Sequence, residues 1–150
     1  MKHIVLVGNM KAGKKGDTIV TYALGTSLGL TAYDPVAKVG GLLHAMLPLS
    51  KTDPKKADAN PCIFVDTGVP KLFEEVCRMG GDKSRLIVRA AGCSRPLGDN
   101  EMFKIGERNY AVLKKILWKN NVLLESEDVG ATANRTLQFD VSTGELTIST

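Results

Sequence analysis

Ser27 and His44 are two residues whose chemistry could combine into a nucleophile and its base. A histidine that accepts a proton from a nearby hydroxyl or thiol turns that group into a nucleophile, which is the first step of many amide hydrolyses. His44 is one of only two histidines in the chain, and the other, His3, lies in an N-terminal apolar run that predicts a strand. Because an isolated serine or histidine is more often structural, the question is whether the fold brings this pair together.

The segment between the two residues predicts that they meet. Asp34-Pro35-Val36-Ala37 is a turn signal between two apolar, glycine-containing runs, 28–33 and 38–46, so we expect a β-hairpin. If Asp34 and Ala37 close the turn, Ser27 lies directly opposite His44, and opposed side chains have Cβ atoms about 4.5–5.5 Å apart. Proline at the second turn position favours turns whose twist suits hairpins poorly, so the register could slip by one or two residues.

Hydrophobic patterning assigns the other elements. We expect strands in 3–8, 18–24, 62–65, 85–91, 122–127, 136–141 and 145–149, helices from Asp66 or Thr67 to Gly80 and over 102–119, and loops at 9–17, 51–60 and 92–100. Two amphipathic helices cannot cover both faces of a large sheet. The predicted class is therefore α+β, a layered sandwich of mixed and antiparallel β-sheets with about two flanking helices, in a single domain of residues 1–150.

Composition narrows the classes of function. No apolar run approaches the roughly 20 residues that span a bilayer, so we expect no membrane insertion. Aromatic residues make up 5% of the chain and do not interleave with the lysines, which argues against nucleic acid. Lysines gather at 11–15 and 51–56, as solvated loop charge or as a footprint for an acidic partner.

The three cysteines show no metal-ligand spacing. We expect reduced thiols in a cytoplasmic protein, without a metal or other cofactor. Cys62 and Cys77 occupy predicted core positions, where thiols are usually inert. Cys93 lies in a predicted loop and could be exposed and reactive.

A phosphate-binding motif competes with this interpretation. Residues 8–14 match Gly-x4-Gly-Lys, but Lys15 stands where magnesium requires Ser or Thr. The following Thr18-Ile19-Val20-Thr21 is β-branched, so the helix N-terminus that would bind phosphate is not expected. Nucleotide binding is therefore the weakest of the hypotheses.

Several motifs together resemble one known family. They are Leu24-Gly25-Thr26-Ser27, Asp34-Pro35, His44-Ala45-Met46-Leu47-Pro48, Asp66-Thr67-Gly68-Val69, Ala91-Gly92, Ile105-Gly106-Glu107-Arg108-Asn109 and Glu127-Asp128-Val129-Gly130. This pattern resembles the chemoreceptor glutamine deamidases, the CheD family of bacterial and archaeal chemotaxis, over nearly the whole chain. The resemblance places Ser27 at the family's catalytic cysteine, His44 at its histidine and Thr21 at its third, supporting residue.

The resemblance implies an amide hydrolase that converts receptor glutamines to glutamate. His44 would activate the nucleophile and protonate departing ammonia, Thr21 would orient the imidazole, and the amides of Thr26 and Ser27 are candidate oxyanion donors. The implied partners are the cytoplasmic helices of chemoreceptors (methyl-accepting chemotaxis proteins) and a CheC-type phosphatase.

Serine at position 27 changes the expected activity. A cysteine ionises near pH 8.5 and is nucleophilic even when weakly activated, whereas a hydroxyl depends wholly on its base. We therefore expect weak or no deamidation, and the serine could be engineered, a natural variant or the mark of a diverged pseudoenzyme. The alternative function is a non-catalytic module that docks on chemoreceptors or on a chemotaxis phosphatase. The family's glycines also differ, because Gly-Gly-Ala-Ser is expected at 91–94 and Gly-Gly at 130–131.

Overall fold

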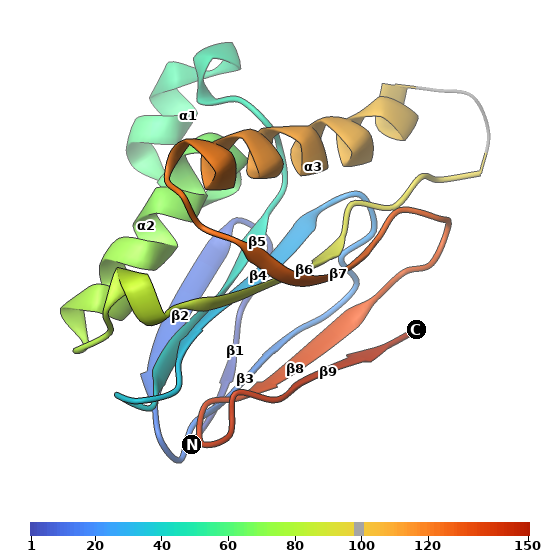
Figure 1. Cartoon of the computed structure of the whole chain (residues 1–150). Helices are drawn as coiled ribbons and strands as arrows, with labels where there is room; N and C mark the ends of the chain where they lie inside the picture. Colours follow the sequence, from blue (N-terminus) through green and yellow to red (C-terminus); the bar gives the residue numbers. More distant parts are fainter. Residues whose placement is uncertain (98–100) are drawn as a thin grey trace.

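The computed structural model describes residues 1–97 and 101–150, in which two β-sheets and three α-helices form three layers (Figure 1). The strands are β1 (Lys2–Ile4), β2 (Asn9–Lys14), β3 (Thr18–Thr21), β4 (Leu28–Asp34), β5 (Val39–Ala45), β6 (Ile87–Gly92), β7 (Leu124–Val129), β8 (Thr136–Asp140) and β9 (Leu146–Ser149). The helices are α1 (Pro54–Ala59), α2 (Val65–Arg78) and α3 (Glu101–Lys119). The predicted α+β sandwich is confirmed, with two long helices and a short one.

A five-stranded sheet in the order β2-β5-β4-β6-β7 is the middle layer. The helices cover one of its faces, and a four-stranded sheet in the order β1-β3-β8-β9 covers the other (Figure 1). Every residue of β4 and β5 is buried because these central strands are covered on both faces. Successive side chains of a strand point to opposite faces, so Leu43 packs in the core under the helices and Leu42 in the core between the sheets. His44 follows the alternation of Leu42 and faces the four-stranded sheet.

The hairpin of β4 and β5 is confirmed, but the predicted register is wrong by two residues. Asp34 pairs with Val39, and His44 therefore lies opposite Gly29. The turn is longer than expected because the Asp34 carboxylate accepts hydrogen bonds from the amides of Val36 and Ala37, at 2.9 and 3.1 Å. A four-residue connection results. Ser27 lies outside the ladder, one residue before β4 begins.

A buried ion pair fixes the same turn from outside the hairpin. Asp34 is fully buried, and the Arg85 guanidinium contacts both of its carboxylate oxygens at 2.8–3.0 Å. This guanidinium, together with three backbone amides, holds the pKa of Asp34 well below its ordinary value. The carboxylate is therefore ionised under ordinary conditions and ties the hairpin to the start of β6.

Some predicted elements are wrong. Residues 9–14 form β2 rather than a loop, and 61–63 form a 3₁₀ turn rather than a strand. The short helix α1 was not predicted, although Asp53 caps it by accepting from the Lys56 amide. The predicted loop 92–100 includes residues 98–100, which lie outside the described part.

Both long predicted helices are confirmed. In α2 the cap is Phe64 instead of Asp66, whose carboxylate accepts from the amide and hydroxyl of Ser50. The segment after the Gly-x4-Gly-Lys match is strand, as expected, so it offers no helix N-terminus to a phosphate. Within residues 1–97 and 101–150, none of the helices combines the length and the apolar character needed to cross a bilayer.

Candidate functional site

Thr21 and His44 are in direct contact between the two sheets. Thr21 ends β3 in the four-stranded sheet, and its Oγ1 lies 2.8 Å from His44 Nδ1 on β5 of the other sheet. The same hydroxyl donates to the carbonyl oxygen of Val5, at 2.7 Å. A hydroxyl has one proton, so Thr21 must accept the proton of His44 Nδ1. This pair fixes the tautomer of the imidazole with Nε2 unprotonated.

Burial keeps this imidazole neutral. The His44 side chain is 1% exposed, and desolvation lowers its pKa to about 4. Nε2 is buried and has no hydrogen-bond partner within the described residues. An unprotonated, unpaired ring nitrogen is what a general base must present near neutral pH. The geometry thus supplies a proton acceptor at Nε2.

Main-chain contacts fix the backbone of Ser27. Its amide donates to the carbonyl of Leu24 and its carbonyl accepts from the amide of Cys93, both at 2.8 Å. The turn before Ser27 is also fixed, because the carbonyl of Gly25 accepts hydrogen bonds from the amide and the hydroxyl of Ser94. None of these bonds uses the hydroxyl of Ser27. Among the described residues the hydroxyl of Ser27 has no hydrogen-bond partner, and the residue is 5% exposed.

Gly92, the last residue of β6, and Arg135, the residue before β8, support this turn. Gly92 has a φ of +94°, and a Cβ at this position would collide with the carbonyl oxygen of Ser27. The Arg135 guanidinium donates to the Gly92 carbonyl at 3.2 Å while it pairs with Asp128 at the same distance. Arg135 is 4% exposed, so its charge depends on these partners.

Asn109 joins the Ser27 turn to the end of β5. Its side-chain amide donates to the carbonyls of Thr26 and Met46, at 3.0 and 3.1 Å. It thereby links the residue before Ser27 with the residue two positions after His44. Gly106, one helical turn earlier on the same face of α3, lets the helix approach the backbone at 93–94, where a Cβ would meet the Cys93 and Ser94 carbonyls.

Asn109 lies in the sequence motif 105–109, but that motif alone does not assign it a role. The available signal was its spacing, because Gly106 and Asn109 lie three residues apart in an amphipathic helix, on the face turned toward the protein. The ion pair between Arg135 and Asp128 is not predicted by the sequence either. Their proximity depends on the pairing of β6 with β7 and on the position of β8, which no local pattern reveals.

The idea of a reactive, exposed Cys93 is wrong. Cys93 is 2% exposed, and desolvation raises the pKa of its thiol to about 12. Reactivity requires the thiolate, which is scarce at neutral pH for such a group. Cys93 instead serves the site through its main chain, by donating its amide to Ser27.

The oxyanion donors suggested by the sequence are only partly available. The Ser27 amide is already used by the Leu24 carbonyl. The Thr26 amide has no partner within the part of the chain that the structure describes. Of the two, the Thr26 amide alone remains a candidate for stabilising a developing negative charge.

The fold and these contacts define a layered α+β protein in which the buried His44 can accept a proton. The turn that carries the Ser27 hydroxyl lies at the same end of the β4–β5 pair as His44. Comparisons with known proteins identify the family. The family model described as "CheD chemotactic sensory transduction" matches residues 46–150. The chain belongs to the CheD family.

Curated relatives extend the likeness to the N-terminal part. A protein of Solibacter usitatus is 46% identical over 144 residues, 95% of this chain and 85% of its own length. One from Pyrococcus horikoshii is 40% identical over 149 residues, 97% of this chain and 91% of its own length. Each is named "Probable chemoreceptor glutamine deamidase CheD". The family model begins after Thr21, Ser27 and His44, so its match does not include these three residues.

Proposed function

We propose that this chain is a chemoreceptor glutamine deamidase in which Ser27 takes the place of the family's cysteine. The observation that carries the proposal is the bond between Thr21 Oγ1 and His44 Nδ1, which leaves His44 Nε2 as a neutral, unpaired base. The names of the relatives give the substrate, a glutamine of a chemoreceptor. The protein would act in the cytoplasm on the receptor's cytoplasmic helices, with a CheC-type phosphatase as a second partner.

In the proposed mechanism, His44 Nε2 takes the proton of the Ser27 hydroxyl as the oxygen attacks the carboxamide carbon. The protonated ring is stabilised by its bond to Thr21 and returns the proton to the leaving nitrogen, which departs as ammonia. Water, activated by the same nitrogen, then hydrolyses the γ-glutamyl ester to give glutamate and restore Ser27. The Thr26 amide would donate to the oxyanion in both steps.

A serine makes this reaction demanding. A hydroxyl must be deprotonated during attack, and His44 has a pKa of about 4, which makes it a weaker base than an ordinary histidine. A cysteine at position 27 would depend less on His44 as a base, because a thiol ionises at far lower pH than a hydroxyl. We therefore propose slow deamidation by the chain as it stands and a marked gain on restoring sulfur.

The test is Ser27→Cys, assayed by mass spectrometry for the conversion of glutamine to glutamate on a chemoreceptor cytoplasmic fragment. We expect at least a hundredfold gain over the unmodified chain, and its loss in the double variant with His44→Ala. Ser27→Ala is the matched control for any residual activity. If the chain deamidates as it stands and Ser27→Ala leaves the rate unchanged, the nucleophile has been misassigned.

The alternative function is a non-catalytic module that binds chemoreceptors or a chemotaxis phosphatase. It is favoured by the serine itself and by the burial of Ser27 and His44, which are 5% and 1% exposed. Failure of Ser27→Cys to deamidate several receptors, while the unmodified chain binds them, would select this function.

A further inference from the structure

Two large apolar side chains protrude side by side at the far end of α3. Trp118 is 78% exposed and Leu123 is 87% exposed. Single exposed apolar residues are ordinary, but these two line the same hollow, of about 320 Å³, between the end of the helix and segment 121–124. Trp118 is also the only tryptophan of the chain, and tryptophan is enriched among residues that anchor protein interfaces.

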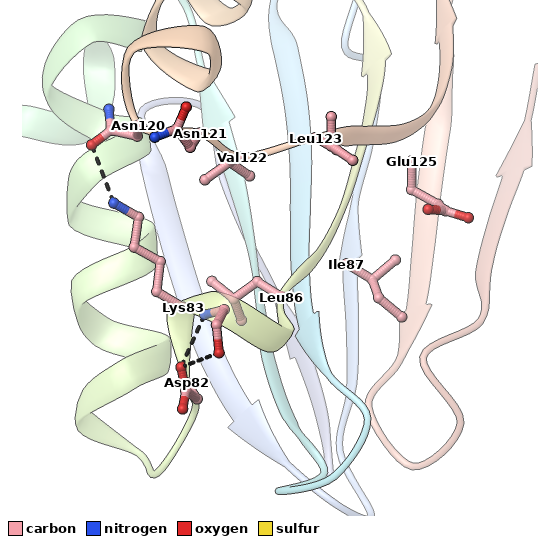
Figure 2. Close-up of a pocket in the computed structure, with 10 residues that line it drawn as sticks. Asp82, Lys83, Leu86, Ile87, Asn120, Asn121, Val122, Leu123 and Glu125 are labelled. Atoms are coloured by element: carbon pink, nitrogen blue, oxygen red, sulfur yellow. Dashed lines mark hydrogen bonds between the residues drawn. The ribbon is translucent and has the colours of Figure 1, made fainter.

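A second, more polar hollow of about 590 Å³ adjoins the first and shares segment 121–123 with it. Figure 2 shows it bounded by the turn at 82–86 on one side and by segment 120–123 on the other, with Lys83 donating to the Asn120 side chain at 3.2 Å. The carboxylates of Asp82 and Glu125 also line this hollow. Segment 120–123 is therefore a ridge with an apolar hollow on one side and a polar one on the other.

A stripe of positive charge leads along α3 to Trp118. Its members are the exposed residues Lys104, Arg108, Lys115 and Lys119. Their spacing of four, seven and four residues places them on one face of the helix, over roughly 22 Å. Among the side chains of residues 1–97 and 104–150, none forms an ion pair with any of the four, whereas the basic residues of α2 pair with its glutamates. A stripe of one sign attracts a partner of the opposite sign.

We propose that this surface docks an acidic amphipathic α-helix of another protein. Carboxylates at four- and seven-residue spacing would lie along the stripe, and an apolar side chain at the end of the partner helix would enter the hollow between Trp118 and Leu123. A single tryptophan offers no series of rings on which nucleic-acid bases could stack, which disfavours single-stranded nucleic acid as the partner.

The experiment uses the full chain and a synthetic helix of about 16 residues that carries glutamates along one face and leucines at one end. Trp118 reports binding directly, since it is the only tryptophan. We expect a saturable blue shift of its emission that weakens with added salt. A peptide of the same composition with a scrambled order should give no shift. Equal binding of both peptides would overturn the proposal.

Variants locate the surface, with binding followed by the anisotropy of a fluorescein-labelled peptide. Lys115→Glu with Lys119→Glu should weaken binding at least tenfold, whereas Lys11→Glu with Lys14→Glu changes the net charge equally and should not. Trp118→Ala should weaken binding about 30-fold, against no change for Val36→Ala, another exposed apolar residue. Equal effects of the two charge pairs would overturn the proposal, as would preferential binding to phosphatidylserine vesicles or to a single-stranded oligonucleotide.

Discussion

The hydroxyl of Thr21 and the imidazole of His44 come from different sheets and meet at 2.8 Å in the interior between them. Because the hydroxyl proton is committed to the carbonyl of Val5, this bond sets the tautomer of the ring as well as its orientation. The candidate base therefore depends on the N-terminal strands as much as on the hairpin that carries it.

Thr21→Val should remove the hydrogen bond that fixes the tautomer of His44. The two side chains have nearly the same shape, but valine leaves His44 Nδ1 and the Val5 carbonyl unpaired, at a cost of about 1–3 kcal/mol in stability. With the Nδ1 bond gone, the proton can move to Nε2, so the rate in the Ser27→Cys background should fall at least tenfold. Nitrogen NMR of the imidazole reports the tautomer, and Thr21→Ser should restore both readings. An unchanged tautomer in Thr21→Val would contradict the assignment.

The free energy of unfolding should decrease as the pH is lowered from about 6.5 to about 4. His44 has a folded pKa of about 4, below its unfolded value, so in this window the unfolded chain binds the extra proton and stability rises with pH. The shift corresponds to about 3 kcal/mol lost on going from pH 6.5 to pH 4. Denaturant unfolding measures it, and His44→Gln, which cannot titrate, should flatten the profile. The Asp34 carboxylate, whose pKa is lowered, loses most of its stabilising effect below about pH 4, where the unfolded chain takes up its proton.

Asn109→Leu should loosen the Ser27 turn without removing any reacting group. Leucine fills the same space but leaves the carbonyls of Thr26 and Met46 without their donor, at about 1–3 kcal/mol. In the Ser27→Cys background we expect deamidation at least tenfold slower, read by mass spectrometry, because Asn109 ties the turn at position 27 to the end of the strand that carries His44. Asn120→Leu is the control, since the side-chain amide of Asn120 likewise donates to a main-chain carbonyl, that of Ile116, but at the other end of α3. Equal slowing by both substitutions would reduce Asn109 to a general stabilising residue.

Ala131→Gly should stabilise the protein. Ala131 has a φ of +57°, a left-handed conformation that glycine adopts without strain. The gain should be about 0.5–1 kcal/mol, or a rise of a few degrees in Tm. Ala111→Gly, on the exposed side of α3, should instead destabilise by about 1 kcal/mol. A loss of stability in Ala131→Gly would show that this strain is absent.

The elements with strong periodicity were predictable from the sequence. Helix α2 shows its buried stripe at helical spacing, and the β4–β5 hairpin shows two apolar runs about a turn signal. Strand β2 was missed because glycine and lysines interrupt its apolar pattern, and its edge position leaves alternate residues exposed. Helix α1 was missed because six residues are too few to show a period.

The sequence suggests candidate residues but not their geometry. The resemblance to the family indicated Thr21, Ser27 and His44, and the structure shows that Thr21 and His44 are bonded. The predicted hairpin register is wrong because the Asp34 carboxylate accepts hydrogen bonds from the amides of Val36 and Ala37, which lengthens the turn. Asn109 could not be given a role, because its two partners are 83 and 63 residues away in the chain. Such contacts follow from the packing of α3 and not from any local pattern.

The turn at Ser27 is held by its main chain, through Leu24, Cys93 and the space left by Gly92, and not by the side chain it presents. Serine and cysteine differ by one atom, and a single base change interconverts their codons. One mutational step can therefore exchange a hydroxyl for a thiol at this position while the main-chain contacts of the turn stay the same. The fold does not dictate which of the two nucleophiles stands at position 27.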